Sequence, residues 1–285
     1  MILIFGSNGL LGSTFKVFLK KKGIDFRSIS YTNGDIKGNI FVKTFLKKKF
    51  LKEKPKIIIN FSAVTNVDYC ENNFKEANKI NSLLPLKISE TLEEIKKDIY
   101  LIHISTDQVY TGKGPHKENE NIYPINVYSK TKFEGEKNIK YKNAIILRTN
   151  FFGKSIVNHR KSFSDWIFEN ISNKNEIKLF SDVFFSPLSF NTFFEILMKI
   201  ISAKPLGTYN LGSNNGMSKK KFAICFARLF KNLELKYKVL SIKNFPLIAK
   251  RPNDMRLDNK KIENILKIKI KSLDEEIKKV SREYS

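Results

Sequence analysis

The chain has 285 residues, 41% of them apolar, and a formal net charge of +24. This length allows one large or two modest domains, and no stretch approaches the roughly 18 uninterrupted apolar residues of a membrane span. Lysine rather than arginine carries most of the positive charge and is spread along the chain. We therefore expect a solvated basic surface, with no nucleic-acid or membrane partner, that still attracts an anionic substrate.

The first half alternates short apolar runs with helical patterns. The expected strands are residues 2–5, 25–30, 56–63, 99–105 and 144–150, and the expected helices are residues 10–23, 41–53, 72–96 and 127–140. Such alternation, with continuously apolar strands, predicts an α/β fold in which helices cover both faces of a parallel sheet. We therefore expect a doubly wound Rossmann domain over residues 1–150, which binds its ligands at the carboxyl ends of the strands.

The second half is less regular. It contains helical patterns at 162–173, 190–203 and 218–231, a short strand near 177–180, the run GTYNL at 207–211 and a terminal helix after Ser272. These elements predict a smaller α/β lobe that binds the substrate. It occupies mainly residues 151–285, and this prediction allows part of that stretch to return to the first domain.

A glycine-rich turn lies between the first expected strand and the first expected helix. The stretch IFGSNGLLG places Gly6, Gly9 and Gly12 in a G-x-x-G-x-x-G pattern. The first glycine permits a tight turn, the second lets the backbone approach a pyrophosphate, and the third lets helix and strand pack closely. A purely structural turn is the alternative, but the position between strand and helix favours a dinucleotide site.

The end of the second expected strand bears on the choice of cofactor. Ser30 stands where an NAD-binding domain usually has a carboxylate for the adenosine ribose. A site without that carboxylate can accept a 2′-phosphate, whose cationic partner would have to be a lysine, so the sequence favours NADPH and leaves NADH as the alternative. Asp35 and Ile36 are expected at the adenine, with the carboxylate accepting from the amino group and the isoleucine packing on the ring.

Two stretches carry groups suited to acid–base chemistry. HISTDQVY ends a strand with hydroxyls at Ser105 and Thr106 and a carboxylate at Asp107, and further on Tyr128 precedes Lys132 by four residues. Residues i and i+4 share a helix face, so the lysine can lie near the phenol and lower its pKa from about 10. Tyr128 is then the expected proton carrier, Thr106 binds the reacting oxygen, and Asp107 orients the substrate or assists protonation.

Cysteine and histidine are too scattered to predict a metal site. Cys70 and Cys225 lie far apart, and His103, His116 and His159 do not cluster. We expect two reduced thiols, no metal ion, and a cytoplasmic protein without a leader peptide. His103 lies within an apolar strand and is expected in the core.

Taken in chain order, several motifs resemble those of the extended short-chain dehydrogenases/reductases, and within them the dTDP-4-dehydrorhamnose reductase group. They are GSNGLLG (6–12), INFSAVTNVDYCE (59–71), Asn81, STDQVY (105–110), VYSKTKFEGE (127–136), LRTNFFG (147–153), FSDVFFSPLS (180–189) and RPNDMRLDNKKI (251–262). They cover nearly the whole chain. The resemblance implies NADPH- or NADH-dependent reduction of a 4-keto-6-deoxy sugar on a nucleotide diphosphate, in the synthesis of activated L-rhamnose and surface polysaccharide.

The resemblance also implies residue roles. Thr106, Tyr128 and Lys132 match the family's catalytic triad, with Tyr128 as proton donor and Lys132 also as ribose ligand. Beside these two, the implied cofactor positions are Gly6, Ser7, Asn8, Gly9, Leu10, Leu11, Gly12, Asp35, Ile36, Phe61, Ser62, Ala63 and Asn81. The implied positions near the nucleotide sugar are Val67, Asp68, Arg148, Phe151 and Arg251. A helix cap for Asp68 and a surface cation for Arg251 are the alternatives.

Three departures from the family pattern fall on the substrate side. Gln108 replaces a tyrosine, Phe151 replaces a tryptophan, and VFFSP at 183–187 replaces Gln-Phe-Gly-Ser-Pro. They leave the identity of the sugar and nucleotide open. Gln108 cannot supply the second carboxylate of the related 4,6-dehydratases, which argues against dehydration. The other rivals are a nucleotide-sugar epimerase that retains NAD and a non-catalytic cofactor-binding regulatory subunit, and a homodimer is a possible assembly.

Overall fold

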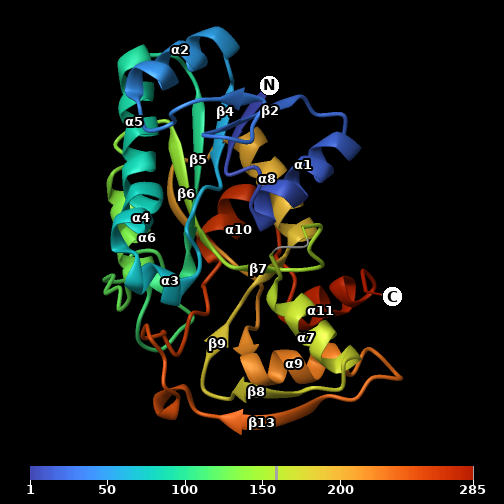
Figure 1. Cartoon of the computed structure of the whole chain (residues 1–285). Helices are drawn as coiled ribbons and strands as arrows, with labels where there is room; N and C mark the ends of the chain where they lie inside the picture. The colour runs from blue at the N-terminus through green and yellow to red at the C-terminus, as the bar shows by residue number, and fades with distance from the viewer. Residues whose placement is uncertain (158–159, 285) are drawn as a thin grey trace.

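The computed structural model describes residues 1–157 and 160–284, and its centre is a seven-stranded parallel sheet (Figure 1). The strands follow the order β11-β6-β5-β4-β1-β2-β3, and every neighbouring pair is parallel. Their bounds are β1 Ile2–Phe5, β2 Phe26–Ser30, β3 Ile36–Lys37, β4 Ile57–Asn60, β5 Tyr100–Thr106, β6 Ala144–Thr149 and β11 Gly207–Leu211. The predicted parallel sheet is therefore confirmed.

The central strands are continuously apolar because both of their faces are covered. β1 reads ILIF, β4 begins with three isoleucines, and all residues of both strands are buried. β-branched side chains fit such a pleated, buried surface. The register aligns Phe5 of β1 with Asn60 of β4, and Asn60 with His103 of β5, so the carboxyl ends of the strands meet at one edge of the sheet.

Helices cover both faces of the sheet, with α1, α8 and α10 on one face and α2, α5 and α6 on the other (Figure 1). Their bounds are α1 Leu10–Lys21, α2 Lys43–Glu53, α5 Leu84–Ile95, α6 Val127–Lys137, α8 Phe190–Ala203 and α10 Lys260–Leu266. Phe15, Phe194 and Ile262 share the core of the first face, and Phe50 and Leu92 share that of the second. The fold is thus doubly wound, as predicted. Within the residues that the structure describes, no helix is both long and apolar enough to cross a bilayer.

The helical stretch expected over residues 72–96 is divided into several elements. The structure has α3 (Val67–Asn72), α4 (Phe74–Asn78), the π-helix η1 (Lys79–Leu83) and then α5. Asn73, with φ −131° and ψ 52°, separates α3 from α4, and Pro85 lies in the first turn of α5. Because proline cannot donate to the preceding turn, it suits the start of a new helix, and the widened π turn lies directly before it.

The chain after residue 150 forms a smaller lobe and also returns to the sheet. In the described part of the chain the lobe contains the strand pairs β7–β10, β9–β12 and β8–β13, with α7, α9 and α11 packed around them. The bounds are β7 Phe151–Phe152, β8 Glu176–Phe180, β9 Phe184–Phe185, β10 Leu188–Ser189, β12 Met217–Ser218, β13 Lys236–Leu240, α7 Phe163–Ser172, α9 Lys219–Ala227 and α11 Leu273–Ser281. The GTYNL run is β11, an edge strand of the large sheet. A domain division at residue 150 stays a prediction.

Candidate active site

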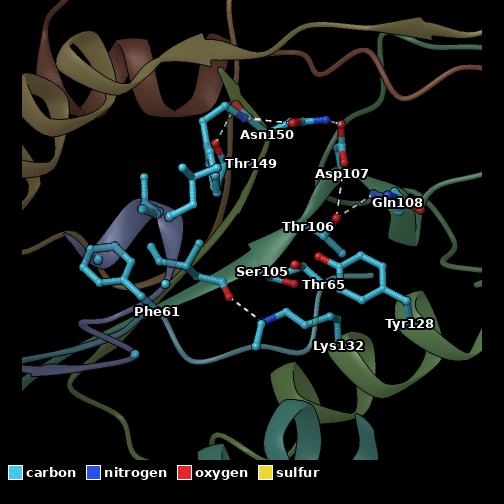
Figure 2. Close-up of a pocket in the computed structure, with 18 of the residues that line it drawn as sticks. Phe61, Thr65, Ser105, Thr106, Asp107, Gln108, Tyr128, Lys132, Thr149 and Asn150 are labelled. Carbon is cyan, nitrogen blue, oxygen red and sulfur yellow. Dashed lines mark hydrogen bonds between the residues drawn. The ribbon is translucent and has the colours of Figure 1, made fainter. Parts of the chain in front are cut away.

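A cavity of about 710 Å³ lies at the carboxyl ends of β1, β4, β5 and β6, and we call it the main cavity (Figure 2). The glycine loop and α1 form one wall, and α6 contributes Tyr128 and Lys132. Arg160 and Lys161 reach it from the segment before α7. The lining residues are Gly6, Gly9, Leu10, Leu11, Gly12, Phe61, Ala63, Thr65, Asn66, Ile104, Ser105, Thr106, Asp107, Gln108, Tyr128, Lys132, Thr149, Asn150, Phe151, Arg160 and Lys161.

Two of the three loop glycines leave no room for a side chain. Gly6 has φ +73°, and a Cβ there would lie 2.5 Å from the backbone nitrogen of Ser62. A Cβ on Gly12 would overlap the carbonyl oxygen of Gly6. Gly9 is the N-cap of α1 and has more room, since the nearest atom to its Cβ would be 3.5 Å away. The first N–H groups of α1, like those of any helix, lack intrahelical partners and can bind a pyrophosphate.

The residues expected at the adenosine end lie beside this loop. Asn8 donates to the carbonyl oxygen of Asn33 at 2.6 Å, which ties the glycine loop to the turn after β2. Ser30 Oγ accepts from the N–H of Asn33 at 2.9 Å. Asp35 accepts from the N–H and the hydroxyl of Ser28, and these bonds lower its pKa against the effect of burial. The cofactor contacts that remain predictions here are those of Ser7, Asn8, Ser30, Asp35 and Ile36.

The segment after β4 forms the next wall of the main cavity. Phe61 and Ala63 line it, and Phe61 packs edge-on against Phe15 of α1 with ring centroids 5.4 Å apart. The N–H of Ser62 donates to the side chain of Asn60 at 3.0 Å. Phe61 and Ala63 therefore form part of the cavity wall, and contacts of Phe61, Ser62 and Ala63 with a cofactor stay predictions.

Asn81 connects this segment to α6. It is buried in η1, accepts from the N–H of Val64 at 2.9 Å and donates to Oγ1 of Thr131 at 3.1 Å. Its amide therefore holds the cavity wall and α6 at a set distance. A direct contact of Asn81 with the cofactor stays a prediction.

The structure brings Thr106, Tyr128 and Lys132 together at the main cavity. A capping box at Asn126 begins α6, so Tyr128 lies in the first turn of the helix. Tyr128 and Lys132 extend from α6 toward the end of β5, where Thr106 lies (Figure 2). Lys132 Nζ donates to the carbonyl oxygen of Ile104 at 2.7 Å. All three side chains are buried, so their mutual geometry is fixed by the protein.

The proton affinities of Tyr128 and Lys132 follow from their burial. Burial raises the pKa of Tyr128, and the hydrogen bond with Thr106 offsets only part of the rise. Burial lowers the pKa of Lys132 to about 8, against the opposing charge of Glu136. The structure therefore corrects the expected lowering of the phenol's pKa by Lys132. Burial dominates at the phenol, and the ammonium is engaged with Ile104.

Asp107 is a buried carboxyl at the main cavity. Its Oδ2 accepts from Asn150 Nδ2 at 2.8 Å, and its Oδ1 accepts from Thr106 Oγ1 at 3.2 Å (Figure 2). Burial raises the pKa of Asp107 to about 6, although both bonds and the charge of Lys219 favour the carboxylate. Asp107 can therefore gain or lose a proton near neutral pH, which suits either role expected of it.

Arg148 lies behind the wall of the main cavity. Its Nη2 contacts Glu136 Oε2 at 2.7 Å, and its Nη1 donates to the hydroxyl of Tyr110 at 2.8 Å. The arginine and the glutamate are both buried. A contact of Arg148 with the nucleotide sugar stays a prediction, and the geometry gives this guanidinium other partners.

Of the remaining residues expected on the substrate side, one lies at the main cavity and three lie in or beside α3. Phe151 lines the main cavity. Arg251 Nη2 lies 2.9 Å from Asp68 Oδ2, so this ion pair joins α3 to the segment near residue 250. Val67 packs with Tyr128 in a small apolar cluster. Contacts of Val67, Asp68 and Arg251 with substrate stay predictions.

Several lining residues were not singled out from the sequence: Thr65, Asn66, Thr149, Asn150, Arg160 and Lys161. The first four stand at or after the ends of β4 and β6, where parallel sheets gather their ligands, and that position was an available signal. Asn66 also caps α3, the role considered for Asp68. Arg160 and Lys161 belong to the segment before α7, and no local sequence pattern predicts that this segment reaches the cavity.

In the ranges 1–157 and 160–284, no group of three or more His, Cys, Asp or Glu side chains could hold a metal ion. His103 is in the core, as expected, and His116 pairs with Glu120 at 2.6 Å. His159 lies outside the described residues. Burial raises the pKa of the Cys70 thiol to about 11, which makes it a poor nucleophile at neutral pH.

Comparisons with known proteins identify relatives of the whole chain. The family model of the RmlD substrate binding domain matches residues 1–285. The spore coat polysaccharide biosynthesis protein SpsK of Bacillus subtilis is 30% identical over 76% of this chain and 74% of its own. The dTDP-4-dehydrorhamnose reductase of Aggregatibacter actinomycetemcomitans is 28% identical over 92% of each chain. The crystal structure of a dTDP-4-dehydrorhamnose reductase from Clostridium acetobutylicum superimposes with a TM-score of 0.88 at 27% identity, covering 99% of both chains.

Proposed function

The chain belongs to the RmlD family of the extended short-chain dehydrogenases/reductases, and we propose that it is an NADPH-preferring reductase of a nucleotide-activated 4-keto-6-deoxyhexose. The reaction adds a hydride to C4 of the sugar and a proton to its oxygen, so the ketone becomes an alcohol and NADPH becomes NADP⁺. The observation that carries the proposal is the convergence of Thr106, Tyr128 and Lys132 on a cavity bounded by the glycine loop.

The residues around the glycine loop fit a dinucleotide. Gly6, Gly9 and Gly12 line the main cavity together with the start of α1, and the first N–H groups of a helix, which lack intrahelical partners, can bind a pyrophosphate. Phe61 lines the adjoining wall, and Tyr128 and Lys132 lie across from it (Figure 2). These residues would hold NADPH, whose nicotinamide supplies the hydride when bound.

Two observations support a preference for NADPH over NADH. Ser30 ends β2 without a negative charge that would repel a 2′-phosphate. Lys16 Nζ lies 3.4 Å from Asn8 Oδ1, so α1 brings a cation to the loop that contacts the turn after β2. A 2′-phosphate near Ser30 would be attracted by that charge.

Tyr128 is the proposed proton donor. Its raised pKa keeps the phenol protonated at neutral pH, which a reduction requires. The hydroxyl of Thr106 would donate to the carbonyl oxygen that Tyr128 protonates. The ammonium of Lys132, which the carbonyl oxygen of Ile104 holds, is the proposed ligand of the cofactor ribose.

The other end of the main cavity supports a nucleotide sugar as substrate. Asp107 and Asn150 offer hydrogen bonds to sugar hydroxyls, and Phe151 offers an apolar surface. Arg160 brings positive charge suited to a diphosphate, and Lys161 lies beside it in an ion pair with Glu169. The relative SpsK is named for spore coat polysaccharide synthesis, which supports a product that enters surface polysaccharide synthesis.

The proposal is tested by the loss of NADPH absorbance when the pure protein meets dTDP-4-keto-6-deoxy-L-mannose, made in place by the two upstream enzymes. NADH and a GDP-linked keto sugar run in parallel. Rapid oxidation with the dTDP sugar is the expected result. Activity only with another nucleotide would keep the reductase and revise the substrate. A bound cofactor that is never consumed would favour the epimerase or the regulatory subunit.

A further inference from the structure

A buried polar layer lies directly behind the main cavity. Ser105 of β5, Arg148 of β6 and Asn210 of β11 are register partners on three adjacent strands, so their side chains leave the sheet on the same face. Ser105 bonds Glu136 of α6, so this is the face that α6 covers. Thr106 and its register partner Thr149 each follow a residue of this layer, and both line the main cavity.

Glu136 is the centre of this layer. Arg148 Nε lies 3.1 Å from each of its carboxylate oxygens, Nη2 donates to Oε2 at 2.7 Å, and Ser105 donates a short bond to Oε1. The side chains of Arg148 and Glu136 are 6% and 4% exposed. Such a buried ion pair loses so much hydration that it contributes little net stability, and apolar residues could often replace it. Its presence beside a candidate catalytic lysine therefore suggests a role other than stability.

Lys132 lies one helical turn before Glu136. Tyr128, Lys132 and Glu136 follow one another at intervals of four residues and share one face of α6. Lys132 bonds the carbonyl oxygen of Ile104, and Glu136 bonds the hydroxyl of Ser105. Successive turns of α6 thus hold successive residues of β5, and the next residue of that strand is the candidate catalytic threonine.

We infer that Glu136 and Arg148 are positioning residues for Lys132, which keep its ammonium charged and directed at Ile104. Arg148 binds both carboxylate oxygens of Glu136, so the carboxylate supports Lys132 by its field without drawing the ammonium into an ion pair of its own. The inference rests on the proposed function, in which Lys132 serves the cofactor and Tyr128. It gives Arg148 a role that needs no contact with substrate.

Among the groups around Lys132, Glu136 carries the charge that favours the protonated form of the lysine. The titratable and charged groups from the elements packed at this face are Tyr128, Glu136, His103, Asp107, Arg148 and, at the first turn of α6, Glu71. His103 is neutral, because burial and then the charge of Lys132 hold its pKa well below the usual value. Glu136 is the charge that opposes the effect of burial on the pKa of Lys132.

Glu136→Gln tests the inference, and Glu134→Gln is its matched control. Glu134 is on the same helix, but it is exposed and paired with Lys137 at 2.5 Å. For each variant, kcat and the dissociation constant of NADPH are measured across the pH range around the pKa of Lys132. Removing the carboxylate disfavours the charged ammonium. The basic limb of the pH profile, in which activity falls as pH rises, should therefore move to lower pH. If the basic limb moves down by about one pH unit, activity at pH values above the wild-type limb falls roughly tenfold. Glu134→Gln should follow the wild type.

Two further variants separate positioning from simple stability. Arg148→Gln leaves Glu136 free to pair with Lys132, so the basic limb should move to higher pH while kcat falls. The double variant Glu136→Gln with Arg148→Gln removes both charges without leaving either unpaired, and it should show the shift to lower pH even where Glu136→Gln alone folds poorly.

An unchanged basic limb in a folded Glu136→Gln or double variant would overturn the inference, whatever the change in melting temperature. If the wild type bound NADPH but reduced no keto sugar, the proposed function would fail instead. The limb would then be read from NADPH affinity alone, and a shift there would still support the inference.

Discussion

The ammonium of Lys132 donates a 2.7 Å hydrogen bond to the carbonyl oxygen of Ile104, two residues before Thr106 in β5. This bond joins the helix that carries Tyr128 to the strand that ends at Thr106. Reductions of this kind depend on reacting groups held within hydrogen-bond reach of the substrate, and small displacements cost rate. β5 is buried throughout, and the face of α6 that carries Tyr128 and Lys132 is buried, so the candidate catalytic groups are positioned before substrate binds.

Tyr128→Phe should lower kcat by about 10²- to 10⁴-fold, the usual contribution of a positioned general acid. The ring keeps its apolar contacts with Val67, so NADPH affinity should change little. Tyr69→Phe is the control, because Tyr69 is exposed and its hydroxyl bonds Glu76 away from the main cavity. Turnover by Tyr128→Phe equal to that of the control would remove the proton-donor role.

Asn150→Ala should move the acidic limb of kcat/KM to higher pH. Asn150 donates to Asp107, and this bond favours the carboxylate, so its loss raises the pKa of Asp107 further above about 6. If the carboxylate form orients the sugar, activity appears only as pH rises through that pKa. Asn143→Ala, which breaks an exposed bond to Asp98, should leave the profile unchanged. An acidic limb that does not move in Asn150→Ala would show that Asp107 does not set it.

Gly12→Ala should destabilise the fold by about 1–3 kcal/mol, the usual cost of overpacking, because its Cβ would overlap the carbonyl oxygen of Gly6. Gly9→Ala has room for the methyl group and should unfold at the wild-type denaturant concentration. It should nevertheless bind NADPH more weakly, because the methyl group stands where the pyrophosphate approaches. Equal unfolding midpoints for the two variants would contradict this account of the loop.

Ser30→Asp should weaken NADPH binding more than NADH binding. The new carboxylate can still accept from the N–H of Asn33, so the turn after β2 is preserved. Its charge repels a 2′-phosphate but can bind ribose hydroxyls. Ser30→Ala, which adds no charge, is the control. The ratio of the two dissociation constants is the measurement, and an unchanged ratio would place the 2′-phosphate elsewhere.

Most of the large sheet could be predicted from the sequence, because each buried strand is a local run of apolar residues between turn signals. The π-helix η1 could not, since a single widened turn leaves the helical apolar pattern almost unchanged. β13 was also missed. Four of its five residues are exposed, so it has little of the alternation or continuous apolarity that marks a strand. Two expectations stay predictions: that no nucleic acid is a partner, and that the protein forms a homodimer.

The candidate site could be predicted where its parts are close in sequence. The glycine spacing and the four-residue step from Tyr128 to Lys132 are local patterns. The partner of Arg148 is not, because Glu136 is brought to it by the packing of α6 on the sheet, where the helix contacts β5. The bond between Asp107 and Asn150 joins residues that directly follow two different strands, β5 and β6. The raised pKa of Tyr128 depends on burial, which spacing alone does not reveal.

In the proposed reaction, hydride passes from NADPH to C4 of the keto sugar. This transfer is tested most directly by running the reaction with NADPH deuterated at the transferring position of the nicotinamide and locating the label in the purified nucleotide sugar. One deuterium per product molecule at C4 of the sugar, with stoichiometric NADP⁺, is the predicted result. Product without label at C4, or a sugar altered while the cofactor stays bound and unconsumed, would contradict the reductase.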